Sequence, residues 1–223
     1  MSSCRISFLR HYYKYSGGHQ KVRDYLSHFK SFGMTAELYL ATRPNAAPSL
    51  FSDIQGVIYQ PEYAPDDCDL VFLAGMDWQH YLPVQHGNNT VINLIQHVRH
   101  ADHSSPLHQY LAQPALRLCV SDAVKNAIAP YANGPCEVIR MGIDIPPMPQ
   151  SKKNEVYIQA VKQPALGETL QHWVRQSGLS CVMHNQHVSR EAGLAAMAES
   201  RISVVLPNKT EGFYLPGIEA MSL

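Results

Sequence analysis

Short apolar runs alternate along the chain with segments in which apolar residues recur every three to four positions. The runs typical of buried strands lie at 4–9, 36–41, 57–59, 69–74, 90–95, 117–120, 136–140, 155–160, 179–183 and 202–206. Helical spacing predicts a helix that opens at Gly17 and ends at Gly33, helices over 165–177 and 189–199, and a helix that begins near Pro216. Another helix is predicted to start at Asp122, capped by Ser121, and to break at Gly134-Pro135. Such alternation predicts an α/β fold built on parallel sheets.

A segment rich in proline, 145–154 (IPPMPQSKKN), has no periodic apolar pattern and therefore predicts a linker between two domains. We place the boundary so that a Rossmann-like domain covers 1–147 and a second one covers 148–223. The second half holds only three predicted strands, whereas a complete doubly wound domain has about five or six. We therefore expect the second domain to be incomplete and, through an unpaired sheet edge, to promote self-association.

Composition narrows the class of protein. The 18 Lys and Arg residues balance 18 Asp and Glu residues, and neither half is strongly basic, so no nucleic-acid partner is expected. The 5 cysteines are scattered and never form a C-x-x-C pair, which is typical of reduced thiols in the cytoplasm. The apolar stretch near the start, Ile6 to Leu9, is too short for a signal peptide. We expect a cytoplasmic protein. An alternative is peripheral contact with the inner face of a membrane, which is suggested by four basic residues near the first helix: Lys14, Lys21, Arg23 and Lys30.

The segment after the last predicted strand carries the clearest chemical signal. It runs as EGFYLPGIE from Glu211 to Glu219, between a strand and a helix, and ligands of open α/β sheets bind outside the carboxyl ends of strands. Pro216 suits a first helical turn, and the free N–H groups at a helix start suit a phosphate. The two carboxylates can accept hydrogen bonds from sugar or ribose hydroxyls. A simpler explanation for Glu219 is that the helix dipole favours an acidic residue in the first turn.

The string EGFYLPGIEAM, following ISVVLP, resembles the E-x7-E signature of retaining glycosyltransferases of the GT-B fold, family 4 in particular. Looser similarities to that family occur in YSGGHQKVRDYLSHFKSFG, LCVSDAVKNAIAPY, VIRMGIDIPP and SREAGLAAMAE. The resemblance implies two Rossmann-like domains of the GT-B type. It also implies transfer of a hexosyl group, with retention, from a nucleotide diphosphate sugar to a saccharide or glycoconjugate acceptor in polysaccharide biosynthesis.

The same resemblance implies roles for particular residues. Glu211 would contact the donor sugar near the reacting carbon, and Glu219 would hold the ribose hydroxyls. Further donor contacts would come from Lys162, Arg190, Gly212, Phe213, Tyr214, Leu215, Pro216 and Gly217. In the first domain, Gly17 and Gly18 match the loop near the phosphates and the acceptor, and His97 follows a strand where related enzymes place a histidine near the sugar. The family pairs an arginine with the lysine; here only Lys162 matches clearly, and Arg190 is the candidate for its partner.

No metal or cofactor is expected, because such enzymes meet the charge of the leaving diphosphate with cationic side chains and helix N-termini. Asp67-Cys68-Asp69 has the D-x-D spacing of metal-dependent transferases, but it precedes a predicted strand instead of following one. His97, His100 and His103 would share a helix face, but they fall in a predicted loop. Two other functions stay open: a GT-B-shaped sugar-nucleotide epimerase and a non-catalytic nucleotide-binding fragment. The sequence does not encode the base, the sugar or the acceptor in a readable pattern.

Overall fold

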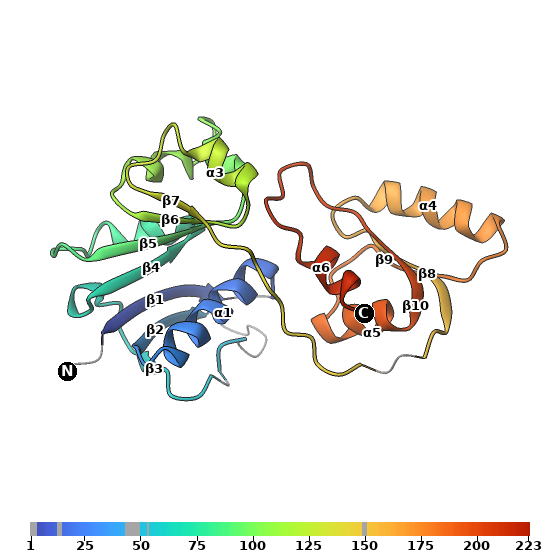
Figure 1. Cartoon of the computed structure of the whole chain (residues 1–223), viewed down its shortest axis with the longest axis horizontal. Coiled ribbons are helices and arrows are strands. Elements are labelled where there is room, and N and C mark those ends of the chain that lie inside the picture. Colours follow the sequence, from blue (N-terminus) through green and yellow to red (C-terminus); the bar gives the residue numbers. More distant parts are fainter. Residues whose placement is uncertain (1–3, 13–14, 43–49, 53, 149–150) are drawn as a thin grey trace. The chain divides into compact units, whose positions relative to one another are not determined.

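The computed structural model describes residues 4–12, 15–42, 50–52, 54–148 and 151–223 (Figure 1). It divides into two compact units, Met1–Arg140 and Met141–Leu223, and each is described by itself. The predicted boundary after residue 147 therefore falls inside the second unit. A hydrogen bond at 2.9 Å from Arg190 Nη2 to the carbonyl oxygen of Asp144 connects the residue just before the predicted linker to α5 (Arg190–Ala198) of that unit.

The first unit contains a seven-stranded, all-parallel sheet in the order β3-β2-β1-β4-β5-β6-β7. Its strands are β1 (Arg5–Tyr12), β2 (Thr35–Thr42), β3 (Ile58–Gln60), β4 (Leu70–Ala74), β5 (Thr90–Ile95), β6 (Leu116–Cys119) and β7 (Cys136–Val138). This arrangement confirms the predicted α/β class with a Rossmann-like sheet. The strand order reverses direction between β1 and β4, and ligands of such sheets bind at the carboxyl ends of strands at this point.

Three α-helices accompany this sheet in the described part of the first unit: α1 (Gly17–Ser31), α2 (Trp78–Tyr81) and α3 (Asp122–Ile128). A serine side chain caps the start of both α1 and α3, and of these two caps only Ser121 was predicted. Ser16 Oγ accepts a hydrogen bond from His19 N, and Ser121 Oγ accepts one from Val124 N, each at 3.3 Å. Four single turns of 3₁₀ helix were not predicted: η1 (Pro65–Asp67), η2 (Gly75–Asp77), η3 (Val98–Ala101) and η4 (His108–Ala112).

Helix α3 ends at Ile128, well before the predicted break at Gly134-Pro135. Gly134 has a different role, because it has a φ of +122° and lies against the backbone at the start of β6. A Cβ atom added there would lie 2.2 Å from the carbonyl oxygen of Ala115. That oxygen belongs to backbone and cannot swing aside. Glycine is therefore required at this position for both its dihedral angle and its size.

We expect Gly134→Ala to lower the free energy of unfolding by at least about 2 kcal/mol, because it combines a strained φ with overlap against backbone. Urea unfolding followed by circular dichroism measures the change. Gly178→Ala is the matched control, since Gly178 has a φ of +75° but nothing within 4 Å of the added Cβ. Equal losses in the two variants would contradict a role for the close approach to Ala115.

A fully buried arginine lies within the first sheet. Arg117 on β6 is 0% exposed, and its guanidinium group donates to Asn93 Oδ1 on β5 at 2.8 Å. It also donates to three backbone carbonyl oxygens in and beside η4, those of Tyr110 and Leu111 at 3.1 Å each and that of Gln113. The guanidinium carbon lies 5.5 Å from the ring centroid of Trp78, and burial lowers the pKa of Arg117 to about 10. Arg117 therefore connects η4 to the sheet through its hydrogen bonds, and among the described residues it is the only donor to Asn93 Oδ1.

The second unit contains a parallel sheet in the order β10-β8-β9, formed by β8 (Asn154–Gln159), β9 (Cys181–His184) and β10 (Ser200–Val205). Its helices are α4 (Pro164–Gln176), α5 (Arg190–Ala198) and α6 (Leu215–Met221). Val156, Ile158, Ala160 and Leu206 form its buried apolar cluster. Ile202 on β10, an edge strand of this three-stranded sheet, is 57% exposed. Self-association through this sheet stays a prediction.

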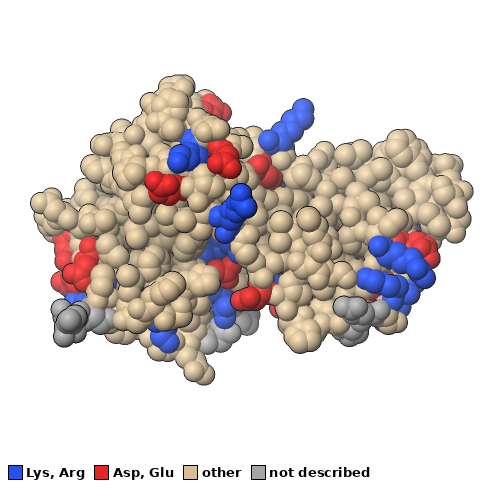
Figure 2. All heavy atoms as spheres, viewed as in Figure 1, with Lys and Arg blue, Asp and Glu red and all other residues tan. Residues whose placement is uncertain are grey.

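Charged side chains of both signs are interspersed over the face shown in Figure 2. Of the four cations near α1, Lys14 lies outside the described residues, and Lys21 is buried with its Nζ 2.6 Å from Asp24 Oδ2. Arg23 Nε donates to the Leu50 carbonyl oxygen at 2.9 Å, and Lys30 Nζ donates to that of Gln55. Membrane contact stays a prediction in which Lys21 can take no part. Among the described helices, none has both the length and the apolar character required to cross a bilayer.

Candidate functional site

The predicted donor loop follows β10 and leads into α6 of the second unit. Helix α6 begins at Leu215, one residue before Pro216, so both residues and Gly217 lie in its first turn, while Gly212, Phe213 and Tyr214 precede it. The carboxylate of Glu219 follows the first turn instead of lying within it, which corrects the predicted position. Because the helix dipole acts mainly within the first turn, it no longer accounts for this glutamate.

Tyr214 holds the loop against the carboxyl ends of two strands. Its hydroxyl group donates to Gln159 Oε1 at the end of β8 at 3.2 Å, and it lies 3.5 Å from the carbonyl oxygen of Leu206 after β10. Burial and the nearby negative charge of Glu211 raise the pKa of Tyr214 to about 12. The phenol therefore remains a hydrogen-bond donor throughout the physiological pH range.

Glu211 forms an ion pair with a lysine that follows β8. Lys162 Nζ lies 3.6 Å from Glu211 Oε1, and the lysine side chain is 42% exposed while that of the glutamate is 11% exposed. Gln163, the residue after the lysine, donates from Nε2 to the carbonyl oxygen of Pro207 at the start of the loop. The turn after β8 and the loop after β10 are thus held together on the same edge of the sheet.

Glu219 forms a second, more deeply buried ion pair. Arg190, the first residue of α5, donates from Nε to Glu219 Oε1 at 2.8 Å, and the glutamate is 5% exposed. A buried carboxylate is stable only when a cation or hydrogen-bond donors offset its desolvation. Glu219 Oε2 has no hydrogen-bond partner among the residues that the structure describes. One carboxylate oxygen is therefore held in place, and the other is able to accept a further hydrogen bond.

Two further polar residues at this edge were not predicted as site residues. Tyr157 on β8 is buried, and its hydroxyl group lies 3.0 Å from Nδ1 of His184, the last residue of β9. Burial, followed by the proximity of Tyr214 and Glu219, raises the pKa of Tyr157. Burial lowers the pKa of His184, so its imidazole is neutral at neutral pH. The position of His184 directly at a strand end was the available signal, because strand ends in parallel sheets line ligand sites.

Three predicted site residues, Gly17, Gly18 and His97, belong to the first unit. The two glycines open α1, and a Cβ atom on Gly18 would lie 3.2 Å from Oε1 of Gln96, the residue before His97. The glycine turn and the end of β5 are therefore adjacent. His97 is half-buried and immediately precedes η3, so the predicted loop contains a helical turn.

The other candidate metal ligands of the first unit lie apart. His100 is buried, and burial together with His97 and Arg99 lowers its pKa to about 3. The D-x-D segment lies before β4, as expected, and Asp69 Oδ2 accepts a hydrogen bond from Arg5 N at 2.8 Å. In the portions of the chain that the structure describes, no three His, Cys, Asp or Glu residues are grouped so that they could hold a metal ion.

The second unit thus brings Lys162 to Glu211 and Arg190 to Glu219, in each case from different elements of the fold. These side chains form two cation–carboxylate pairs at the carboxyl edge of one parallel sheet, with Tyr157, His184 and Tyr214 alongside. The cations can attract a negatively charged ligand, and Glu219 Oε2 can accept a hydrogen bond from a hydroxyl group. This surface therefore suits a ligand that carries both hydroxyl groups and negative charge. No protein-family model and no curated protein matches this chain.

Proposed function

We propose that the second unit binds a nucleotide diphosphate sugar. The observation that supports this proposal is the pairing of both carboxylates of the E-x7-E segment with cations from other elements, Lys162 with Glu211 and Arg190 with Glu219. Two carboxylates can hold hydroxyl groups at two ends of a ligand, and the exposed lysine can neutralise a diphosphate between them. The separate positions of Glu211 in the loop and Glu219 in α6 suit a ligand with hydroxyl groups on both the sugar and the ribose.

The particular protein we propose is a retaining glycosyltransferase of the GT-B type, similar to family 4. Glu219 Oε2 accepts from the ribose hydroxyls, and Glu211 binds the donor sugar near its anomeric carbon. Lys162 exchanges part of its interaction with Glu211 for the diphosphate, whose negative charge grows as the glycosyl bond breaks. Gly17, Gly18 and His97 of the first unit contribute on the phosphate and acceptor side. The acceptor is a saccharide or glycoconjugate, and the reaction takes place in the cytoplasm.

A thermal-shift panel of UDP, GDP and ADP tests donor binding. We expect one nucleotide to stabilise the protein, by about 2.7 kcal/mol when its concentration is about 100 times Kd. Glu219→Gln removes the charge that receives the ribose hydroxyls and is expected to abolish most of that shift. Glu168→Gln, an exposed glutamate on α4, is the matched control and should retain the shift. If none of the three nucleotides raises the melting temperature of the unaltered chain, the proposed donor site is wrong.

The two alternative functions predict different results in the same protein. An epimerase would convert the nucleotide sugar without transferring it, which thin-layer or NMR analysis of the donor alone reveals. A non-catalytic binding fragment would give the thermal shift with no change in the donor, with or without an added saccharide. Transfer of the sugar to an acceptor is the result expected for the glycosyltransferase.

A further inference from the structure

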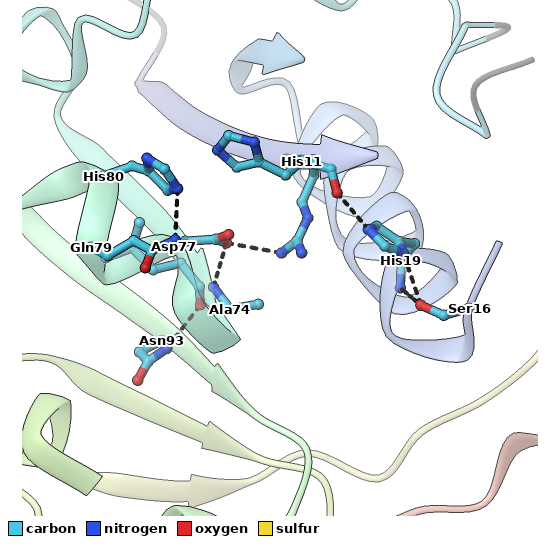
Figure 3. A network of polar contacts seen from close by, with 10 residues as sticks. His11, Ser16, His19, Ala74, Asp77, Gln79, His80 and Asn93 are labelled. Atoms are coloured by element: carbon cyan, nitrogen blue, oxygen red, sulfur yellow. Dashed lines mark hydrogen bonds and ion pairs between the residues drawn. The ribbon is translucent and has the colours of Figure 1, made fainter. Parts of the chain in front are cut away.

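A second polar cluster lies at the carboxyl ends of β1 and β4, where the strand order of the first sheet reverses (Figure 3). Arg10 and His11 lie at the end of β1, and Asp77 and His80 follow β4 in η2 and α2. None of these four residues was predicted to be functional, and none belongs to the second unit. Their position is the one at which open parallel sheets bind ligands.

Arg10 has more donors than partners. Its side chain is 14% exposed, and Nη1 lies 2.8 Å from Asp77 Oδ2. Nε is buried without a hydrogen-bond partner, and Nη2 makes no hydrogen bond to any residue that the structure describes. A guanidinium group carries five N–H donors. Most of the hydrogen-bonding capacity of this half-buried cation is therefore unused by the protein.

The only carboxylate in this cluster is already engaged. Asp77 is 4% exposed, and its Oδ2 accepts both from Arg10 and, at 2.8 Å, from the backbone N–H of Ala74. Burial raises the pKa of Asp77 to about 6, against the opposing effects of those two donors. Asp77 thus orients the guanidinium group, and its negative charge is already paired with Arg10.

Two imidazoles face each other beside Arg10. The ring centroids of His11 and His80 are 4.2 Å apart, at an interplanar angle of 33°. His80 Nε2 lies 2.9 Å from Nε2 of Gln79, and the His11 ring makes no hydrogen bond within the described parts of the chain. Burial, His80 and Arg10 lower the pKa of His11. His19 of α1 also faces Arg10, and its Nε2 lies 3.1 Å from the carbonyl oxygen of His11. One permanent cation and three groups that can become cations are therefore gathered around a single engaged carboxylate.

We propose that this edge binds an oxyanion, the phosphate or carboxylate group of a small ligand, between the Arg10 guanidinium and the imidazoles of His11 and His80. An oxyanion accepts hydrogen bonds from the unpartnered guanidinium N–H groups and from protonated imidazoles. Its negative charge also reduces the repulsion between the positive charges of these groups. Arg10, His11 and His80 all belong to the first unit, and none of them is among the residues proposed for the nucleotide-sugar site.

Sulfate is the first probe, because its charge is constant over the pH range in which histidine titrates. The bound anion favours protonated His11 and His80 and therefore raises their pKa values, so binding is strongest at acid pH. Isothermal titration calorimetry should show one sulfate per chain, with affinity falling at least about tenfold between about pH 5.5 and about pH 8. No binding at the acid pH, or equal affinity at both, would overturn the proposal.

The double variant H11Q/H80Q should bind sulfate at least about tenfold more weakly at acid pH than the unaltered chain. His172→Gln, at an exposed position on α4, is the matched control and should bind normally. If the double variant does not fold, NMR of the unaltered chain replaces it, and the proposal requires sulfate to raise the pKa of His11. Methyl phosphate and glucuronate, compared under the same conditions, distinguish a phosphorylated ligand from a carboxylated one. Glu219→Gln should leave sulfate binding unchanged, so failure here and failure of the proposed nucleotide-sugar site are separable.

Discussion

Replacing Arg117 by methionine is expected to lower the free energy of unfolding by at least about 3 kcal/mol, because four acceptors lose a donor at once and one of them, Asn93 Oδ1, is buried. Methionine occupies a similar volume, so the loss reports hydrogen bonds more than packing. Among the described residues, Asn93 Oδ1 and the carbonyl oxygen of Gln113 lose their only donor, whereas the carbonyl oxygens of Tyr110 and Leu111 keep the backbone N–H groups of Gln113 and Asn133. Asn93 is buried, so water replaces its lost donor only if the structure opens locally.

Urea unfolding of the variant and of Arg201→Met measures this effect. Arg201 on β10 has a side chain that is 63% exposed, and its ion pair with Glu155 spans 3.4 Å. Exposed pairs contribute about 0–1 kcal/mol, so the control should change little. A loss of less than about 1 kcal/mol in Arg117→Met would show that the acceptors find other donors.

Glu211→Gln is expected to lower the rate of sugar transfer by about 100-fold or more, a typical cost of removing one preorganised electrostatic contact to the transition state. The replacement keeps the size of the side chain but removes the charge that is paired with Lys162. Because the proposed contact of Glu211 is with the donor sugar, binding of the free nucleoside diphosphate should change by only a few-fold. This pattern differs from that of Glu219→Gln, which removes a proposed contact to the nucleotide itself.

The measurement is a product assay with the nucleotide sugar selected by the thermal-shift panel, combined with calorimetry using the free nucleotide. Glu168→Gln again serves as the control for removing one glutamate charge from the same unit. Equal losses of transfer and of nucleotide binding in Glu211→Gln would assign this residue to the nucleotide and contradict its proposed place beside the sugar.

Most of the strands and long helices could be predicted because each carries a repeated pattern. The apolar runs correctly located all ten described strands to within a few residues, and α1 begins at Gly17, the glycine predicted to open it. Helix α2 and the 3₁₀ turns could not be found in this way, since a single turn is too short to show a period. The end of α3 was placed too late because Gly134 was interpreted as a helix breaker, whereas it accommodates the backbone of Ala115.

The candidate sites were only partly predictable, for a different reason. Lys162, Arg190 and the two glutamates lie next to strand ends and helix starts, which the sequence locates. Tyr157 and Arg117 lie inside apolar strands, where a polar residue gives no local sign of the partner it will meet across the sheet. The contact of His11 with His80 joins two strand ends that are adjacent only because the strand order reverses there.

The guanidinium group of Arg190 contacts two segments of the chain at once. Through one side chain it connects the Glu219 carboxylate in α6 with the backbone of Asp144, which lies between the last strand of the first unit and the first strand of the second. A ligand that moved the Glu219 carboxylate would weaken its hydrogen bond with Arg190. The hydrogen bond from Arg190 to the Asp144 carbonyl oxygen would then be less restrained. By thermodynamic reciprocity, a rearrangement of the connecting segment that displaces Arg190 must change ligand affinity by the same factor. If the proposed donor binds at Glu219, its binding would therefore be coupled to the conformation of the segment around Asp144.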